Sequence, residues 1–95
     1  MPDDVFIIIP CYNESAVIRQ TVERLLPLGH QLVIVDDGSS LNPWPRLQDL
    51  PVHFLRHPVN LGQGAALQTG MDYASARRAR AVIHFDADGR LTRSA

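Results

Sequence analysis

The sequence has a single cysteine and no long hydrophobic run among its 95 residues. Cys11 has no second cysteine with which to form an internal disulfide, which is typical of a protein from a reducing compartment. The longest apolar run, Val5 to Pro10, is far too short to span a bilayer. Asp3 and Asp4 stand where a signal peptide would have a basic start, so we expect no signal peptide and a cytoplasmic location.

The chain also lacks an excess of positive charge. Nine basic residues stand against ten acidic ones, and the formal net charge is -1. A protein that binds nucleic acid or the surface of a membrane usually carries a basic excess. We therefore expect no nucleic-acid partner. With 45% hydrophobic and 20% charged residues, the composition is that of one soluble globular domain.

Four segments have the pattern of β-strands. Continuous β-branched and aromatic runs at Val5 to Ile9 and Gln31 to Asp37 are typical of strands that are covered on both faces. Two further strands are predicted at Pro51 to Leu55 and at Ala81 to Asp88. With the helices between them, these strands predict an α/β domain: a mostly parallel sheet of about four strands with flanking helices.

Two segments between the strands have helical periodicity. We expect Asn13, Glu14 or Ser15 to cap the first helix and the second helix to start between Leu61 and Gly64. In sheets of this kind, ligands bind at the carboxyl ends of the strands. The polar segments that directly follow the strands should therefore meet at one edge of the sheet and form a site there.

The segment IVDDGSS, residues 34–40, places two adjacent carboxylates at a strand end. Asp36 and Asp37 repel each other unless backbone amides, a metal or a ligand with N–H and hydroxyl donors compensates their charge. A nucleoside offers such donors in its base and its ribose. A phosphorelay receiver domain also carries paired acids at a strand end. The structural alternative is a solvated turn with Asp37 and Gly38 at its corner.

The segment HFDADGRL, residues 84–91, places Asp86 and Asp88 one residue apart at the end of the last predicted strand. Hard carboxylate ligands suit Mg²⁺ or Mn²⁺, which would also bind a diphosphate. The segment also nearly copies the D-x-D-G-T-L motif of haloacid-dehalogenase-type phosphatases, in which Asp86 would be the nucleophile. Arg90 stands where that family has threonine. A purely structural turn is the third alternative.

The segment NLGQGAAL, residues 60–67, places two glycines near the predicted start of the second helix. Gly62 and Gly64 suit a close approach of the backbone to phosphate. They also match part of the fingerprint of Rossmann dinucleotide sites, but Leu67 replaces its third small residue, so that signal is weak. The four histidines show no spacing that is typical of metal ligands.

Taken in order, the motifs PCYNES, VDDGS, NLGQGAAL and DADG resemble the nucleotide-sugar-binding half of a family 2 glycosyltransferase. The resemblance is to the branch that includes dolichyl-phosphate and undecaprenyl-phosphate sugar transferases and bacterial cell-wall enzymes, and it covers Val5 to Gly89. It implies a Rossmann-like GT-A fold, a UDP- or GDP-sugar donor, Mg²⁺ or Mn²⁺, and inverting transfer. It also implies that full-length relatives act on lipid acceptors at the cytoplasmic face of a membrane.

The resemblance also assigns the residues of the site. The implied nucleotide-sugar contacts are Pro10, Tyr12, Glu14, Asp36, Asp37, Asn60, Gly62, Gly64 and Asp86. Asp36 would face the base, and Asp37 would face the ribose or its surroundings. Asp86 and Asp88 would be the metal ligands, with Asp88 in the most direct contact. The catalytic residues stay unknown.

Members of the family are longer, and after the D-x-D pair they carry acceptor-binding strands and a late acidic residue that acts as general base. We therefore expect residues 1–95 to be a partial glycosyltransferase domain, the donor-binding half, which transfers no sugar by itself. The alternative from another class is a non-catalytic half-domain. It would self-associate as a homo-oligomer through an exposed edge at the fourth strand.

Overall fold

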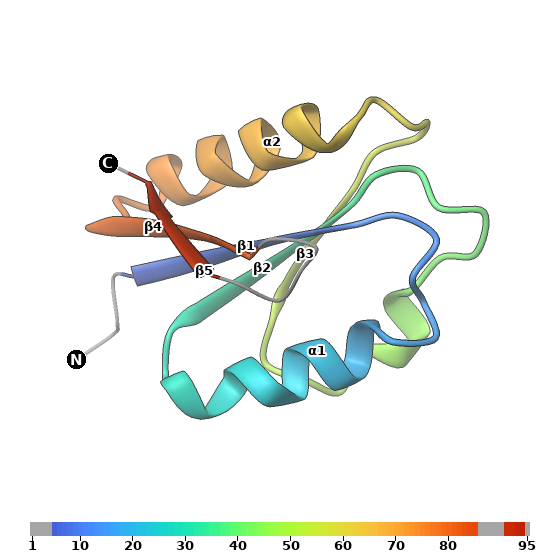
Figure 1. Ribbon diagram of the computed structural model, residues 1–95, viewed down its shortest axis with the longest axis horizontal. Coiled ribbons are helices and arrows are strands. Elements are labelled where there is room, and N and C mark those ends of the chain that lie inside the picture. Colours follow the sequence, from blue (N-terminus) through green and yellow to red (C-terminus); the bar gives the residue numbers. More distant parts are fainter. Residues whose placement is uncertain (1–4, 86–90, 95) are drawn as a thin grey trace.

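The computed structural model describes residues 5–85 and 91–94. In these residues a sheet of five strands lies between helices, as Figure 1 shows. The elements, in which η denotes a short 3-10 helix, are β1 (Val5–Cys11), α1 (Ile18–Leu25), η1 (Leu26–Leu28), β2 (Gln31–Asp36), η2 (Trp44–Arg46), β3 (His53–Arg56), α2 (Gln63–Ala76), β4 (Ala81–Phe85) and β5 (Leu91–Ser94). Neither helix of this described part is long and apolar enough to cross a membrane.

The order of the strands in the sheet is β3-β2-β1-β4-β5. The first four are parallel to one another, which confirms the predicted α/β fold with a mostly parallel sheet. β5 pairs antiparallel with β4 and was not predicted, because its sequence LTRS is short and polar. The prediction of an open edge at the fourth strand was wrong, since β4 lies between β1 and β5. Among the described residues the edge strands are β3 and β5.

The two faces of the sheet are covered by different helices, with α1 on one side and α2 on the other (Figure 1). Side chains alternate along a strand, so Ile7 and Ile9 of β1 pack on the α1 side. Phe6 and Ile8 pack on the α2 side. This alternation explains why a continuous apolar run in the sequence forms a central strand that is buried on both faces.

Helix α2 lies very close to β1. The small residues Ala66, Gly70 and Ala74 form a buried stripe on the face of α2 that meets the sheet. A Cβ atom on Gly70 would collide with Cγ2 of Ile8 and would lie 3.1 Å from its Cδ1. This close packing fixes the position of α2, and therefore of its first turn at the carboxyl edge of the sheet.

Helix α1 begins later than the sequence predicts. Its first residue is Ile18, and no side chain caps it, so the prediction of a cap at Asn13, Glu14 or Ser15 was wrong. Asn13 instead adopts a left-handed backbone conformation with φ of 54°. Its N–H donates to Ser39 Oγ at 2.7 Å, and its side-chain oxygen accepts from the N–H of Ser40 at 2.9 Å. Asn13 therefore joins the loop after β1 to the turn after β2.

Candidate functional site

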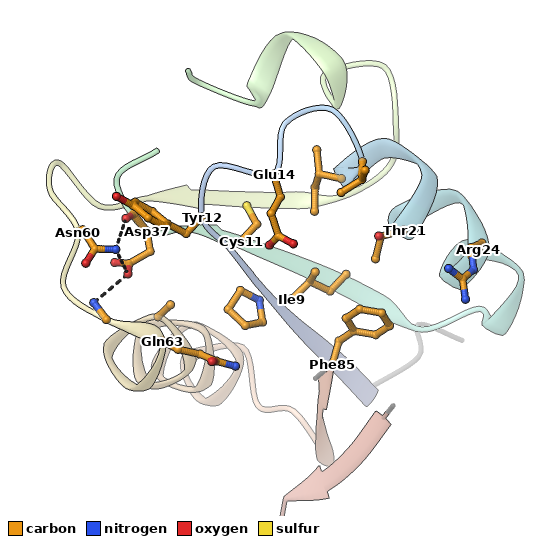
Figure 2. A pocket seen from close by; sticks show the side chains of 15 residues that line it. Ile9, Cys11, Tyr12, Glu14, Thr21, Arg24, Asp37, Asn60, Gln63 and Phe85 are labelled. Carbon is orange, nitrogen blue, oxygen red and sulfur yellow. Dashed lines mark hydrogen bonds between the residues drawn. The ribbon is translucent and has the colours of Figure 1, made fainter. Parts of the chain in front are cut away.

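A cleft with a cavity volume of about 750 Å³ opens at the carboxyl ends of β1 and β2 (Figure 2). The start of α2, the length of α1 and the end of β4 complete its lining. Its volume lies in the range that is usual for sites that bind small molecules and cofactors. The cleft is therefore at the place where the polar segments were expected to meet.

Most of the predicted contacts lie in this cleft. The predicted residues that line it are Pro10, Tyr12, Glu14, Asp37, Asn60 and Gly62. Asp36 and Gly64 are not part of the lining. Asp86 and Asp88 lie outside the described residues, and β4 ends at Phe85, which lines the cleft. The folding thus brings together residues from three distant segments, and their contacts with a ligand stay predictions.

Asp37 is the hub of one side of the cleft. Its Oδ1 accepts hydrogen bonds from His57 Nδ1 at 2.7 Å and from the N–H of Leu61 at 2.9 Å. Its Oδ2 accepts from Asn60 Nδ2 at 2.9 Å and from the N–H of Gly62 at 2.8 Å. Four donors fill the acceptor positions of a carboxylate. The hydrogen bonds of Asp37 therefore hold the loop of residues 57–62 against the end of β2 (Figure 2).

The same hydrogen bonds keep Asp37 ionised. Burial by itself raises the pKa of this carboxyl group. The hydrogen bonds from His57, Leu61 and Gly62 favour the charged form and outweigh burial, so the Asp37 pKa lies below its ordinary value. Hydrogen-bond donors of the protein itself thus compensate the negative charge of Asp37, which lies next to Asp36 in the sequence.

Asp36 is fully buried beneath the cleft and has its own set of partners. It accepts hydrogen bonds from the hydroxyl of Ser39 and, at 3.1 Å, from the N–H of Ser39. Arg56 Nε forms an ion pair with Asp36 Oδ2 at 3.0 Å, and the guanidinium also donates to the carbonyl of Ser39 at 2.6 Å. Asp36 therefore fastens the turn after β2 to the end of β3. The contact of Asp36 with a nucleobase stays a prediction.

Cys11 is buried at the end of β1. Its Sγ lies 3.6 Å from Asp36 Oδ1. Burial, followed by the nearby Asp36 charge, raises the pKa of the Cys11 thiol well above its usual range. The thiol form is therefore the stable one at this position, and the small side chain forms part of the lining of the cleft.

The part of the cleft that α1 contributes was not predicted from the sequence. The lining residues on this side stand at positions i, i+4 and i+7, beside the buried stripe of α1. They are Val17, which directly precedes the helix, Thr21 and Arg24. Figure 2 shows Thr21 and Arg24 at the end of the cleft away from Asn60. These residues could have been predicted from their helical spacing, because residues beside the buried face of a surface helix border any cleft that opens next to that face.

The described residues contain no group of three His, Cys, Asp or Glu side chains that could hold a metal ion. In the cleft, the carboxylates are those of Glu14 and Asp37, and the Asp37 oxygens already have four protein donors. The predicted metal ligands, Asp86 and Asp88, lie outside the described residues, so their role stays a prediction.

The sequence model described as Glycosyl transferase family 2 matches residues 6–95. An uncharacterized protein of Methanocaldococcus jannaschii is 36% identical over 92% of this chain, which corresponds to 36% of that protein. The UDP-N-acetylglucosamine–dolichyl-phosphate N-acetylglucosaminyltransferase of Methanococcus voltae is 31% identical over 90% of this chain and 41% of its own length. The undecaprenyl-phosphate 4-deoxy-4-formamido-L-arabinose transferase of Proteus mirabilis is 32% identical over 88% of this chain and 28% of its own.

The chain thus spans well under half the length of these curated relatives. The match nevertheless covers nearly all of the chain, including β1, the DDGS turn, the loop before α2 and the acidic pair after β4. A match of this extent favours the glycosyltransferase family over the phosphatase alternative, which rested on one motif alone. The chain belongs to glycosyl transferase family 2.

Proposed function

We propose that the cleft binds the nucleoside diphosphate part of a sugar nucleotide, and that residues 1–95 are the donor-binding part of a glycosyltransferase domain. One observation carries this proposal: six residues that were predicted as donor contacts line a single cleft of suitable volume. They come from the end of β1 and the loop after it, from the residue that follows β2 and from the loop before α2. Ligands of parallel α/β sheets bind at this edge.

The chemistry of the lining suits the parts of such a donor. Tyr12 is 46% exposed at the cleft and offers an aromatic face to a nucleobase. The side-chain amide nitrogen of Asn60 donates to Asp37. The side-chain oxygen of Asn60 would therefore be the atom that accepts a hydrogen bond from a base N–H or a ribose hydroxyl. Glu14 points into the cleft from the loop after β1 (Figure 2).

The first turn of α2 suits the phosphates. No side chain caps this helix, and its first backbone hydrogen bond runs from the N–H of Ala66 to the carbonyl of Gly62. The N–H groups of Gln63 and Gly64 therefore point out of the helix end, where the helix dipole favours an anion. A Cβ atom on Gly64 would meet nothing within 4 Å, so the backbone is open to close approach.

A divalent metal fits the donor set that follows β4. Asp86 and Asp88 would hold it, together with oxygens of the diphosphate, and hard oxygen ligands of this kind suit Mg²⁺ or Mn²⁺. When bound, the metal would neutralise charge on the diphosphate leaving group. The residues of the described cleft would bind and orient the nucleoside beside it.

We infer that UDP is the first nucleotide to test, since the Methanococcus voltae relative carries a UDP-sugar in its name. GDP is the second. The proposal includes inverting transfer to a lipid phosphate at the cytoplasmic face of a membrane, as an activity of the whole enzyme. For this chain we propose binding without transfer, because transfer needs a general base at the acceptor hydroxyl. In the cleft, the Asp37 carboxylate is saturated by protein donors, and Glu14 is assigned to the nucleoside.

The alternative function, a non-catalytic module that self-associates, has little support from the described residues. β4, the strand that was expected to be open, is covered by β5. The edge strand β3 has four residues and ends in the exposed Arg56. Short strands and charged ends disfavour edge-to-edge pairing. We therefore retain nucleotide binding as the single proposed function.

Calorimetric titration with UDP, GDP and their sugars, with and without Mn²⁺, tests the proposal. We expect binding that Mn²⁺ strengthens and that Tyr12→Ala weakens by about tenfold, which is the loss of one good stacking contact. Leu28→Ala is the matched control, because Leu28 is similarly exposed but lies in η1, away from the cleft. Absence of heat with every ligand at millimolar concentration would sink the proposed function.

A further inference from the structure

We infer that His57 is a positioning residue for nucleotide binding: acting through Asp37, it sets the geometry of the loop of residues 60–62 that borders the cleft. The inference rests on the proposed function for its ligand, but its structural part concerns this chain alone. His57 does not line the cleft, and no spacing in the sequence marks it.

The imidazole of His57 is held at both nitrogens. Nδ1 lies 2.7 Å from Asp37 Oδ1, and Nε2 lies 2.8 Å from Thr69 Oγ1 in α2. The backbone N–H of His57 also donates to the carbonyl of Asp36 at 2.8 Å. The residue is buried, so water has little access to the ring to replace these partners. Rotation of the ring would break both side-chain hydrogen bonds at once.

The partners of the ring fix the direction of one hydrogen bond. Asp37 is ionised and offers only acceptors, so Nδ1 of His57 carries a proton and donates it. Thr69 then either donates its hydroxyl hydrogen to Nε2 of the neutral ring or accepts from the charged ring. In both protonation states the donor to Asp37 is kept.

This donor matters because each Asp37 oxygen is shared. Oδ1 is bound by His57 and by the N–H of Leu61, and Oδ2 by Asn60 and by the N–H of Gly62. Removal of the imidazole leaves a buried carboxylate oxygen with one donor in place of two, which is costly. The carboxylate would turn to recover a partner and would change its hold on Leu61 and Gly62.

The effect reaches the cleft by a short path. Asn60 and Gly62 line the cleft, and α2 begins at Gln63, the next residue. Thr69 lies on that same helix, so the chain Asp37–His57–Thr69 connects the end of β2 with the body of α2. His57 therefore ties together the two elements between which the nucleotide would lie, without touching the nucleotide.

The test compares three histidine variants in the full chain. His57→Leu removes the donor and keeps an apolar side chain of similar size. His57→Asn places an amide nitrogen near the position of Nδ1 and restores the donor to Asp37. His53→Asn is the matched control, since His53 also has partners on both ring nitrogens but lies at the opposite end of β3.

The first readout needs no ligand. In nitrogen–proton correlation NMR spectra, we expect the amide signals of Leu61 and Gly62 to shift in His57→Leu and to stay near their wild-type positions in His57→Asn and His53→Asn. Unchanged Leu61 and Gly62 signals in a folded His57→Leu protein would overturn the inference. If His57→Leu does not fold, Thr69→Val, which replaces the hydroxyl with a methyl group, must move the same two signals, or the inference fails.

The second readout is the affinity for UDP. We expect His57→Leu to bind about tenfold more weakly and His57→Asn to recover most of that loss, since one charge-assisted hydrogen bond separates them. Equal weakening by His57→Leu and His53→Asn would mean a general loss of stability and would overturn the positioning role. If the wild-type chain binds no nucleotide, the proposed function fails, while the NMR comparison still decides whether His57 positions the loop.

Discussion

Gly38 and Val59 meet backbone to backbone at the carboxyl edge of the sheet. A Cβ atom on Gly38 would collide with the carbonyl carbon of Val59 and would lie 2.5 Å from the backbone nitrogen of Asn60. Gly38 also has a left-handed backbone with φ of 77°. The glycine of the DDGS motif is therefore required by the loop that lies on it, and that loop continues into the cleft.

Gly38→Ala should be strongly destabilising. The left-handed conformation costs about 1–2 kcal/mol for a residue with a Cβ, and the collision adds about 1–3 kcal/mol. We expect the free energy of unfolding in urea to fall by about 2–5 kcal/mol. Gly29→Ala is the control, because Gly29 has the same φ but its Cβ would meet nothing within 4 Å. Equal losses in the two variants would contradict the packing argument.

A second pair of glycines separates packing from binding. Gly70→Ala should lower the free energy of unfolding by about 1–3 kcal/mol, because its Cβ would push α2 away from Ile8. Gly64→Ala should leave stability unchanged or raise it by up to about 1 kcal/mol, since alanine is the better helix former and its Cβ has open space.

The same Gly64→Ala protein then tests the predicted role of Gly64 in phosphate binding. If the diphosphate approaches the first turn of α2, the added methyl group should weaken UDP binding in calorimetry while urea unfolding shows an intact fold. Unaltered affinity would remove Gly64 from the site and leave the other predicted contacts in place.

Stability should depend on pH through His53. Burial, and then the charge of Arg77, lower the pKa of His53 below its ordinary value of 6.5. The folded protein therefore resists protonation that the unfolded chain accepts, so the free energy of unfolding should fall as pH drops below about 6.5. Urea unfolding of the wild type and of His53→Gln between about pH 7.5 and pH 5.5 checks this. We expect a shallower pH dependence in the variant, and parallel curves would refute the assignment.

Arg56→Met should expose the cost of the buried Asp36 carboxylate. Breaking a fully buried pair costs about 3–5 kcal/mol, but the Arg56 side chain is 35% exposed and partly screened, so we expect about 1–3 kcal/mol. Arg46→Met serves as the comparison, since Arg46 is exposed and should change the free energy of unfolding by less than about 0.5 kcal/mol. Similar values for both variants would show that Asp36 does not depend on Arg56.

The main strands and the place of the cleft could be predicted from the sequence because their signals are local. The run at Val5 to Ile9 is apolar at every position, which is typical of a central parallel strand that is covered on both faces. Turn residues such as Gly38 directly follow such runs, and parallel strands bring their ends to one edge. β5 escaped prediction because four residues, LTRS, carry no apolar period and pair only through tertiary context.

The contacts inside the site could not be predicted, because they join residues without any fixed spacing. His57 is 20 residues from Asp37 and 12 from Thr69, and only the folded sheet brings the three together. Asn13 was expected to cap a helix, but it forms hydrogen bonds with Ser39 and Ser40 instead. These tertiary contacts override the local preference of asparagine for a helix N-terminus. The protein partners of the two acids of DDGS were not predicted: Asp36 pairs with Arg56 of β3, whereas Asp37 holds His57 and Asn60.

The central claim is that the cleft at the carboxyl ends of β1 and β2 is the nucleotide site, and NMR titration of the chain with UDP and the diamagnetic ion Mg²⁺ tests it most directly. We predict that the largest amide shifts occur at Tyr12, Glu14 and residues 60–64, with little change at residues 26–28 of η1. Shifts that are absent at millimolar UDP, or that cluster at η1 and the start of β3, would contradict the account.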